Sequence, residues 1–266
     1  MIFRLLKQIL WLLQSLFWHV NILPKKTNYN FTIGIVTYLD RYDTYFKSLI
    51  KKISILFPNQ QIIICVNGYH DEEKQEQYLK KIKDFCLINQ NIKIITHIRP
   101  KGLSLLWNKL INNSKNEKVL ILNDDIDFSP FFLYELIKKR TYEKDFSLIN
   151  NTWSCFFISK KIFSKVGDFD ERLKEVGMED GDYELRMIIN NIPISTTRYF
   201  SFKNLIHKTD NFSYGNEKEN IFNKKYRKYN HVIFHNKWII QKNESEGFYY
   251  YPRNREYFKL NKDFSE

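Results

Sequence analysis

The stretch GMEDGDYELRM, residues 177–187, concentrates acidic side chains in a chain whose formal net charge is +12. Four carboxylates lie within six residues there: Glu179, Asp180, Asp182 and Glu184. The glycine turn and the spacing after it predict a helix, in whose first turn acids are favourable, and Asp182 is spaced to pair with Arg186. Glu179 and Asp180 are expected just before that turn. An oriented, ionised aspartate there can accept a proton from a hydroxyl group.

A second acidic group follows the apolar run KVLILN, residues 118–123, and consists of Asp124, Asp125 and Asp127. Carboxylates this close repel one another, and a divalent cation among them makes the arrangement favourable. Hard oxygen ligands suit Mg²⁺ or Mn²⁺, which leave coordination positions for substrate phosphates. The other interpretation is that Asp127 or Ser129 caps the next helix while Asp124 and Asp125 are solvated turn residues.

Alternating strands and helices must position these acids. Apolar runs predict strands at residues 31–38, 61–68, 92–98, 118–125, 153–159 and 192–200, and helices are expected between the successive strands. Such alternation predicts an α/β fold with a parallel sheet covered on both faces. Ligands of these sheets bind beyond the carboxyl ends of the strands. The segments at those ends are residues 37–41, 67–70, 99–102 and 123–127.

The composition limits which partners and which cellular compartment can be expected. The 42 basic and 30 acidic residues suit an anionic partner, which can be a membrane surface, a nucleic acid or a phosphorylated substrate. The abundance of Lys, Asn and Ile resembles a coding bias, so the net charge is given less weight as an indication of the partner. Three widely spaced cysteines, Cys65, Cys86 and Cys155, indicate neither a disulfide framework nor a zinc knuckle, and a reducing compartment is expected.

The N-terminal residues 1–26 are rich in Leu, Ile, Phe and Trp, but polar side chains interrupt them. The longest apolar run, residues 9–13, falls far short of the roughly 20 residues that span a bilayer. Two interpretations remain. One is an amphipathic helix in the plane of an anionic membrane surface, contacting it through residues 1–23, and the other is a helix packed against the domain.

Several motifs together resemble one enzyme family. VGDFDERLKEVGMEDGDYELRM resembles the segment of GT-A-fold glycosyltransferases, especially family-2-like enzymes of bacterial surface-glycan type, in which a G-x-FDE turn precedes G-x-ED-x-D and an arginine. The motifs FTIGIVTYLDR, GLSLLWNKLI, VLILNDDIDF, LIHKTDNFS and FHNKW resemble further segments of that family in the same order. The resemblance covers roughly residues 31 to 240, which is more specific than any single motif.

The resemblance implies roles for the acidic residues. Asp125, together with Asp127 or Asn123, would hold a divalent metal, Mn²⁺ or Mg²⁺, and His207 would be a further ligand. Asp180 would be the general base that deprotonates the acceptor hydroxyl. Glu179 and Asp182 would orient the acceptor or support the loop.

The resemblance also implies a donor pocket. Thr37, Tyr38 and Arg41 would line the nucleotide pocket, and Asn108 would face the nucleotide. Asn67 stands where the family commonly has an aspartate near the base or ribose. Gly102 and Asp124 are the other residues expected to contact substrate. For Lys237 and Trp238, ordinary packing is expected.

The expected molecule is a single GT-A domain, residues 27–240, with an N-terminal amphipathic segment, residues 1–26, and an aromatic tail, residues 241–266. It would be a metal-dependent inverting glycosyltransferase that uses a nucleotide-sugar donor, a UDP-sugar as the first choice, and a glycan or lipid-linked acceptor. It is expected in the cytoplasm at the inner face of the plasma membrane, with no nucleic-acid partner. The alternatives are a nucleotidyltransferase and a non-catalytic, basic nucleic-acid-binding protein.

Overall fold

A computed structural model describes residues 9, 13, 29–39, 41–87, 90–174, 177–205, 229–240 and 258–264. The expectations for His207, for nearly all of residues 1–26 and for most of residues 241–266 lie outside these residues. No helix of the described residues is both long enough and apolar enough to cross a membrane.

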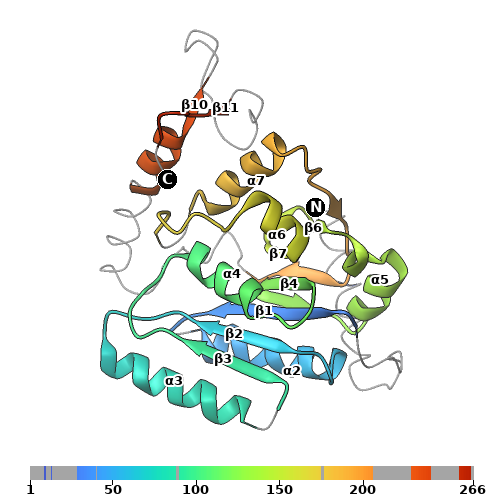
Figure 1. The fold of residues 1–266 in the computed structure, drawn as a ribbon. Coiled ribbons are helices and arrows are strands. Elements are labelled where there is room, and N and C mark those ends of the chain that lie inside the picture. Colours follow the sequence, from blue (N-terminus) through green and yellow to red (C-terminus); the bar gives the residue numbers. More distant parts are fainter. Residues whose placement is uncertain are drawn as a thin grey trace.

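A seven-stranded sheet in the order β3-β2-β1-β4-β7-β6-β8 forms the centre of the described chain (Figure 1). Neighbours among the first four strands pair in parallel, as predicted, while β7 runs antiparallel to β4 and β6 antiparallel to β7. The sheet is therefore mostly parallel at one edge and mixed at the other. Its strands are β1 (Phe31–Thr37), β2 (Ile62–Val66), β3 (Ile92–Thr96), β4 (Lys118–Asn123), β6 (Phe146–Ile149), β7 (Thr152–Ser159) and β8 (Thr196–Thr197).

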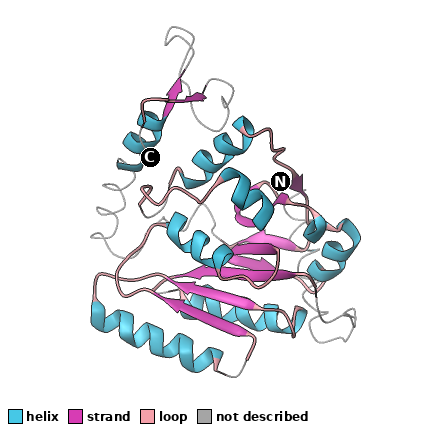
Figure 2. Ribbon diagram, viewed as in Figure 1, coloured by secondary structure: helices cyan, strands magenta, loops and turns pink. Residues whose placement is uncertain are grey.

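Helices cover both faces of this sheet (Figure 2). They are α2 (Lys47–Leu56), α3 (Glu72–Cys86), α4 (Leu103–Asn112), α5 (Phe132–Lys139), α6 (Lys160–Val166) and α7 (Glu179–Ile189), with a π-helical turn η2 (Tyr42–Phe46) and a 3-10 turn η3 (Thr141–Glu143). Successive side chains of a strand point to opposite faces, so β2 contributes Ile62 and Ile64 to one apolar cluster and Ile63 and Cys65 to the other. Helices α2, α3 and α5 pack on the first cluster, and α4, α6 and α7 pack on the second.

The hairpin between β6 and β7 is absent from the sequence-based expectation. Its turn residues, Asn150 and Asn151, both have positive φ, at 53° and 56°. Two left-handed residues between antiparallel strands give the tight hairpin turn for which asparagine is a favoured residue. This Asn-Asn pair was the available signal for β6. The strand expected over residues 192–200 is reduced to the two residues of β8.

Two small antiparallel pairs complete the described fold. β5 (Ile126–Phe128) pairs with β9 (Phe202–Asn204), and β10 (Trp238–Ile240) pairs with β11 (Phe258–Leu260). Residues 229–237 are helical and lead directly into β10, near α7 in Figure 1. We call residues 229–240 the C-terminal brace.

Candidate active site

Asp124 joins the ends of two parallel strands. It follows β4 directly, is 2% exposed, and accepts a 2.7 Å hydrogen bond at Oδ2 from the hydroxyl of Thr37, the last residue of β1. Because Thr37 donates its proton to Asp124, Tyr78 donates to Thr37 across 2.8 Å. Burial raises the pKa of Asp124 to about 7, although the positive charge of Arg41, 3.0 Å away, acts in the opposite direction.

Arg41 compensates the charge of this acidic turn. Its guanidinium contacts Asp124 and also Asp125, with 3.1 Å between Nη2 and Asp125 Oδ2. The same group lies 4.7 Å from the ring centre of Tyr38 and 4.8 Å from that of Tyr45. Two aromatic faces and two buried carboxylates therefore fix a cation at the carboxyl end of β1.

Two oxygen atoms at the end of β4 are buried without a hydrogen-bond partner among the described residues: Oδ1 of Asn123 and Oδ1 of Asp125. Asp127 differs, because it forms ion pairs with Lys52 of α2 and, across 3.6 Å, with Lys203 of β9. A buried oxygen without a donor is costly, and a hard cation is a suitable partner for both atoms. No three acidic, histidine or cysteine side chains of the described chain form a metal-binding group.

The end of β2 is fastened to the turn before α4 by Asn67. Its Oδ1 accepts hydrogen bonds from the backbone N–H groups of Gly68, at 2.9 Å, and Lys101, at 2.8 Å, and its Nδ2 donates to the carbonyl of Lys101 at 3.0 Å. A Cβ on Gly68 would lie 2.1 Å from the backbone of Arg99, so this close approach requires glycine. Gly102, the N-cap of α4, follows in the same turn.

A pocket of about 270 Å³ lies between the segment after β1 and helix α3. Its walls carry two lysines and two tyrosines, and Tyr78 belongs both to the pocket and to the hydrogen bond with Thr37. Lysine and tyrosine side chains suit a ligand that is both anionic and planar. The pocket is lined by Leu39, Tyr42, Asp43, Lys74, Gln77, Tyr78 and Lys81.

Glu179 and Asp180 are the first two residues of α7, so the expectation that they precede its first turn is wrong. Glu179 is 5% exposed and its Oε2 accepts the N–H of Gly177 at 2.5 Å, while Asp180 Oδ1 accepts the N–H of Gly181 at 2.8 Å. Burial raises the pKa of both carboxyl groups, and the charge of Asp180 raises that of Glu179 further. The pKa of Glu179 reaches about 8.

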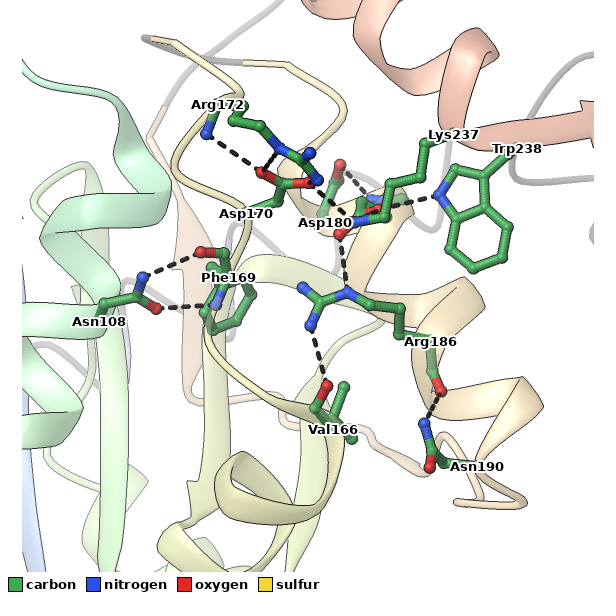
Figure 3. A network of polar contacts seen from close by, with 12 residues as sticks. Asn108, Val166, Phe169, Asp170, Arg172, Asp180, Arg186, Asn190, Lys237 and Trp238 are labelled. Atoms are coloured by element: carbon green, nitrogen blue, oxygen red, sulfur yellow. Dashed lines mark hydrogen bonds and ion pairs between the residues drawn. The ribbon is translucent and has the colours of Figure 1, made fainter. Parts of the chain in front are cut away.

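Asp182 is an anchor inside the protein. It is 1% exposed, and the predicted pair with Arg186 is confirmed, with 2.9 Å between Nε and Oδ2. Its other oxygen receives Lys237 at 2.7 Å and the indole N–H of Trp238 at 2.8 Å, from the C-terminal brace. Figure 3 shows Lys237, Trp238 and Arg186 around the first turn of α7.

Asn108 of α4 holds the turn that precedes the acidic helix. Its Oδ1 accepts the backbone N–H of Phe169 at 2.8 Å, and its Nδ2 donates to the carbonyl of Phe169 at 2.9 Å (Figure 3). The same Nδ2 also donates to Glu171 at 3.0 Å. The side chain is 2% exposed. Every hydrogen-bonding atom of its amide group is thus used within the protein.

The strand β7 brings α7 to the edge of the sheet at which Asp124 and Asp125 lie. Leu122 of β4 pairs with Cys155, so the beginning of β7 adjoins the end of β4. Trp153, in that part of β7, donates its indole N–H to Glu184 of α7 at 2.8 Å. The acids after β4 and the acids of α7 therefore lie beside each other, at the edge of the sheet where β4 ends and β7 begins.

The structure divides the predicted site residues into two groups. The first gathers at the ends of β1 and β4 and comprises Thr37, Tyr38, Arg41, Asp124 and Asp125, while Asp127 turns to Lys52 and Lys203. The second surrounds the start of α7 and comprises Glu179, Asp180, Asp182 and, through Phe169, Asn108. Asn67 directly follows β2, and Gly102 is the N-cap of α4, which follows β3.

The residues whose role the sequence did not reveal belong to the C-terminal brace. Lys237 and Trp238 were expected to pack in an ordinary way, whereas their polar atoms bind Asp182. Asn230, which is fully buried, was not singled out. The motif FHNKW was the available signal for the first two.

The sequence matches no protein-family profile and no curated protein, but solved structures match by fold. A mannosyltransferase from Pyrobaculum calidifontis, in complex with GDP-Man and Mn²⁺, matches with a TM-score of 0.53 at 10% identity, over 77% of this chain and 66% of that one. GalNAc-T7 with UDP, GalNAc and Mn²⁺ matches with a TM-score of 0.52 at 13% identity, over 79% of this chain and 48% of the other. TarS of S. aureus matches with a TM-score of 0.48 at 15% identity, over 64% and 58%.

This chain therefore spans less than two thirds of the length of these structures. The matches above a TM-score of 0.5 establish the fold, which is the GT-A arrangement that the sequence motifs imply.

Proposed function

We propose that the protein transfers a sugar from a nucleotide-diphosphate sugar to a hydroxyl group of an acceptor, with inversion at the anomeric carbon. The observation that carries this proposal is the pair of acidic groups at one edge of a GT-A sheet. One group, after β4, has oxygen atoms without a partner among the described residues, and the other, at the start of α7, places two carboxyl groups side by side, with the pKa of each raised by burial.

The donor lies, in this proposal, against the carboxyl ends of β1, β2 and β4. Thr37, Tyr38 and Arg41 line the nucleotide pocket, and Asn67 with the turn at Gly102 forms its next wall. Asn123 and Asp125 hold a divalent cation, because their partnerless oxygens fit one, whereas Asp127 is already paired with two lysines. A bound Mn²⁺ or Mg²⁺ supplies positive charge that stabilises the departing nucleotide diphosphate.

The acceptor approaches the start of α7. Its hydroxyl oxygen attacks the anomeric carbon, the bond from that carbon to the diphosphate oxygen breaks, and Asp180 accepts the hydroxyl proton. Glu179, which carries a proton at neutral pH, adds no second negative charge beside the base. The N–H of Gly181 fixes the orientation of the Asp180 carboxylate.

A glycan or lipid-linked acceptor fits the apolar and basic character of residues 1–23. In this proposal the segment lies on an anionic membrane surface and brings the catalytic domain to its acceptor. Deleting residues 1–23 should release the protein from vesicles that contain anionic lipid, and continued binding by the shortened chain would refute this part of the proposal.

The function is tested by screening the purified chain against UDP-sugars and GDP-mannose with Mn²⁺, following release of the nucleotide diphosphate. We expect turnover of at least one donor, loss of that turnover with a chelator, and an inverted anomer in the product. Release of pyrophosphate from a nucleoside triphosphate instead would favour a nucleotidyltransferase. A retained anomeric configuration would remove Asp180 from the role of base.

A further inference from the structure

We infer that the C-terminal brace, through Asn230 and Lys237, positions the loop that presents Glu179 and Asp180. The assignment of these two acids to catalysis rests on the proposed function, but the contacts that hold their loop do not. Figure 3 shows how Lys237 and Trp238 reach the start of α7 beside Asp170.

Asn230 fastens both sides of the loop that leads into α7. Its Oδ1 accepts the backbone N–H of Lys174 at 2.8 Å, while its Nδ2 donates to the carbonyl of Lys174 at 2.7 Å and to that of Gly177 at 2.8 Å. The side chain is fully buried. One amide group thus fixes the backbone immediately before and after residues 175 and 176, and Gly177 is itself the donor to Glu179.

Lys237 connects the turn before the loop to the helix after it. Its ammonium group lies 2.8 Å from Asp170 Oδ2 and 2.7 Å from Asp182 Oδ1. Although burial raises the pKa of Asp170, hydrogen bonds from Arg172 and Lys237 bring it well below its ordinary value. Arg172 pairs with Asp170 and Arg186 with Asp182, so each carboxylate keeps one cation without Lys237. Lys237 therefore contributes the connection between Asp170 and Asp182.

The backbone conformation of Met178 is unfavourable, so contacts from outside the loop are needed to stabilise it. It has φ 74°, a left-handed conformation that is unfavourable for a residue with a side chain, and it directly precedes Glu179. Its side chain packs against an apolar cluster to which the brace contributes Phe234 and Trp238. The brace therefore stabilises the strained residue as well as the backbone on either side of it. The other members of the cluster are Leu185 and Phe258.

A positioning role is tested by hydrogen–deuterium exchange of the full chain without any substrate. The variants are Lys237→Met, which removes the connecting cation, Lys237→Arg, which keeps a cation, and Asn230→Ala. Val232→Ala is the matched control, because Val232 belongs to the same helical segment and is 51% exposed. Without Lys237, Asp170 and Asp182 lose the side chain that joins them, so the loop between them loses a constraint on its opening.

We expect Lys237→Met and Asn230→Ala to speed exchange of the amides of residues 177–182 by at least about tenfold, with the amides of β1 and β4 unchanged. Lys237→Arg and Val232→Ala should exchange as the unaltered chain does. Unchanged exchange at residues 177–182 in both Lys237→Met and Asn230→Ala would overturn the inference. Equal acceleration in the sheet would also overturn it, since the brace would then support the whole fold.

A positioning role also predicts a loss of kcat without a loss of affinity for the nucleotide. With the donor that the unaltered protein turns over, Lys237→Met should lower kcat by at least about tenfold while the Kd for UDP with Mn²⁺ stays within about twofold, and Lys237→Arg should restore kcat. An unchanged kcat, or an equal loss of UDP affinity, would contradict the role of Lys237. If the proposed function fails, no donor is turned over, yet the exchange measurement still decides whether the brace holds the loop.

Discussion

At the scale of single residues, the carboxyl pair at the start of α7 combines two opposing demands. Burial penalises both charges and raises the pKa of both groups, whereas the proposed role of Asp180 as a base requires its ionised form; a proton held by Glu179 relieves the repulsion between the two groups. Such perturbed pairs are concentrated at functional sites, although structural carboxyl pairs also show them. The pair can be identified in solution by its proton uptake on folding.

Glu179→Gln tests this protonation through stability. The pKa of Glu179 rises from an ordinary 4.5 to about 8 in the folded protein, so the folded state binds more protons than the unfolded state between these pH values. The free energy of unfolding of the unaltered chain, relative to Glu179→Gln, should fall by at most about 1.4 kcal/mol per pH unit as pH rises from 4.5 to about 8. Urea unfolding measures it; a difference that is independent of pH in this range would contradict the assignment.

The cation-binding residues are distinguished by Asp125→Asn and Asp127→Asn. With UDP and Mn²⁺ present, the unaltered chain should unfold at a higher Tm than without them, because ligands stabilise the folded state that binds them. Asp125→Asn should lose this increase. Asp127→Asn should have a lower Tm without ligand, since it loses the ion pairs with Lys52 and Lys203. It should keep the increase in Tm on addition of UDP and Mn²⁺. A lost increase in Asp127→Asn alone would place the cation at Asp127.

At the scale of elements, most strands and helices were predictable because each carries its own pattern. β1, β2 and β4 are buried apolar runs, and α2 and α4 repeat apolar residues at helical spacing. β6 was not predicted, because four apolar and small residues before an Asn-Asn turn form too short a pattern. Its place depends on pairing with β7 and on the left-handed turn at Asn151.

Asn151→Val tests the hairpin turn. A β-branched residue at φ 56° should cost about 1 to 2 kcal/mol, whereas Asn151→Gly should leave stability nearly unchanged, because glycine adopts positive φ readily. The midpoints of urea unfolding compare the two variants. Equal stability of Asn151→Val and Asn151→Gly would show that the turn does not have this conformation in solution.

At the scale of the whole molecule, the sequence located the two acidic groups but not the contacts that hold them. Residues near one another in the chain revealed the acids after β4 and at α7, because each group has a local pattern. Asn230 and Lys237 lie some fifty residues or more after the groups they bind, and no local pattern predicts such a meeting. The orientation of Asp127 toward Lys52 likewise depends on α2 packing beside β5.

The most direct test of the proposed function is the turnover of a nucleotide sugar by Asp180→Asn, with Mn²⁺ and acceptor, against the unaltered chain. Removing a general base should lower kcat by about 10² to 10⁴-fold. The affinity for UDP should stay the same, because Asp180 serves the acceptor rather than the donor. An Asp180→Asn protein that transfers sugar at the rate of the unaltered chain would contradict the proposed function of this site.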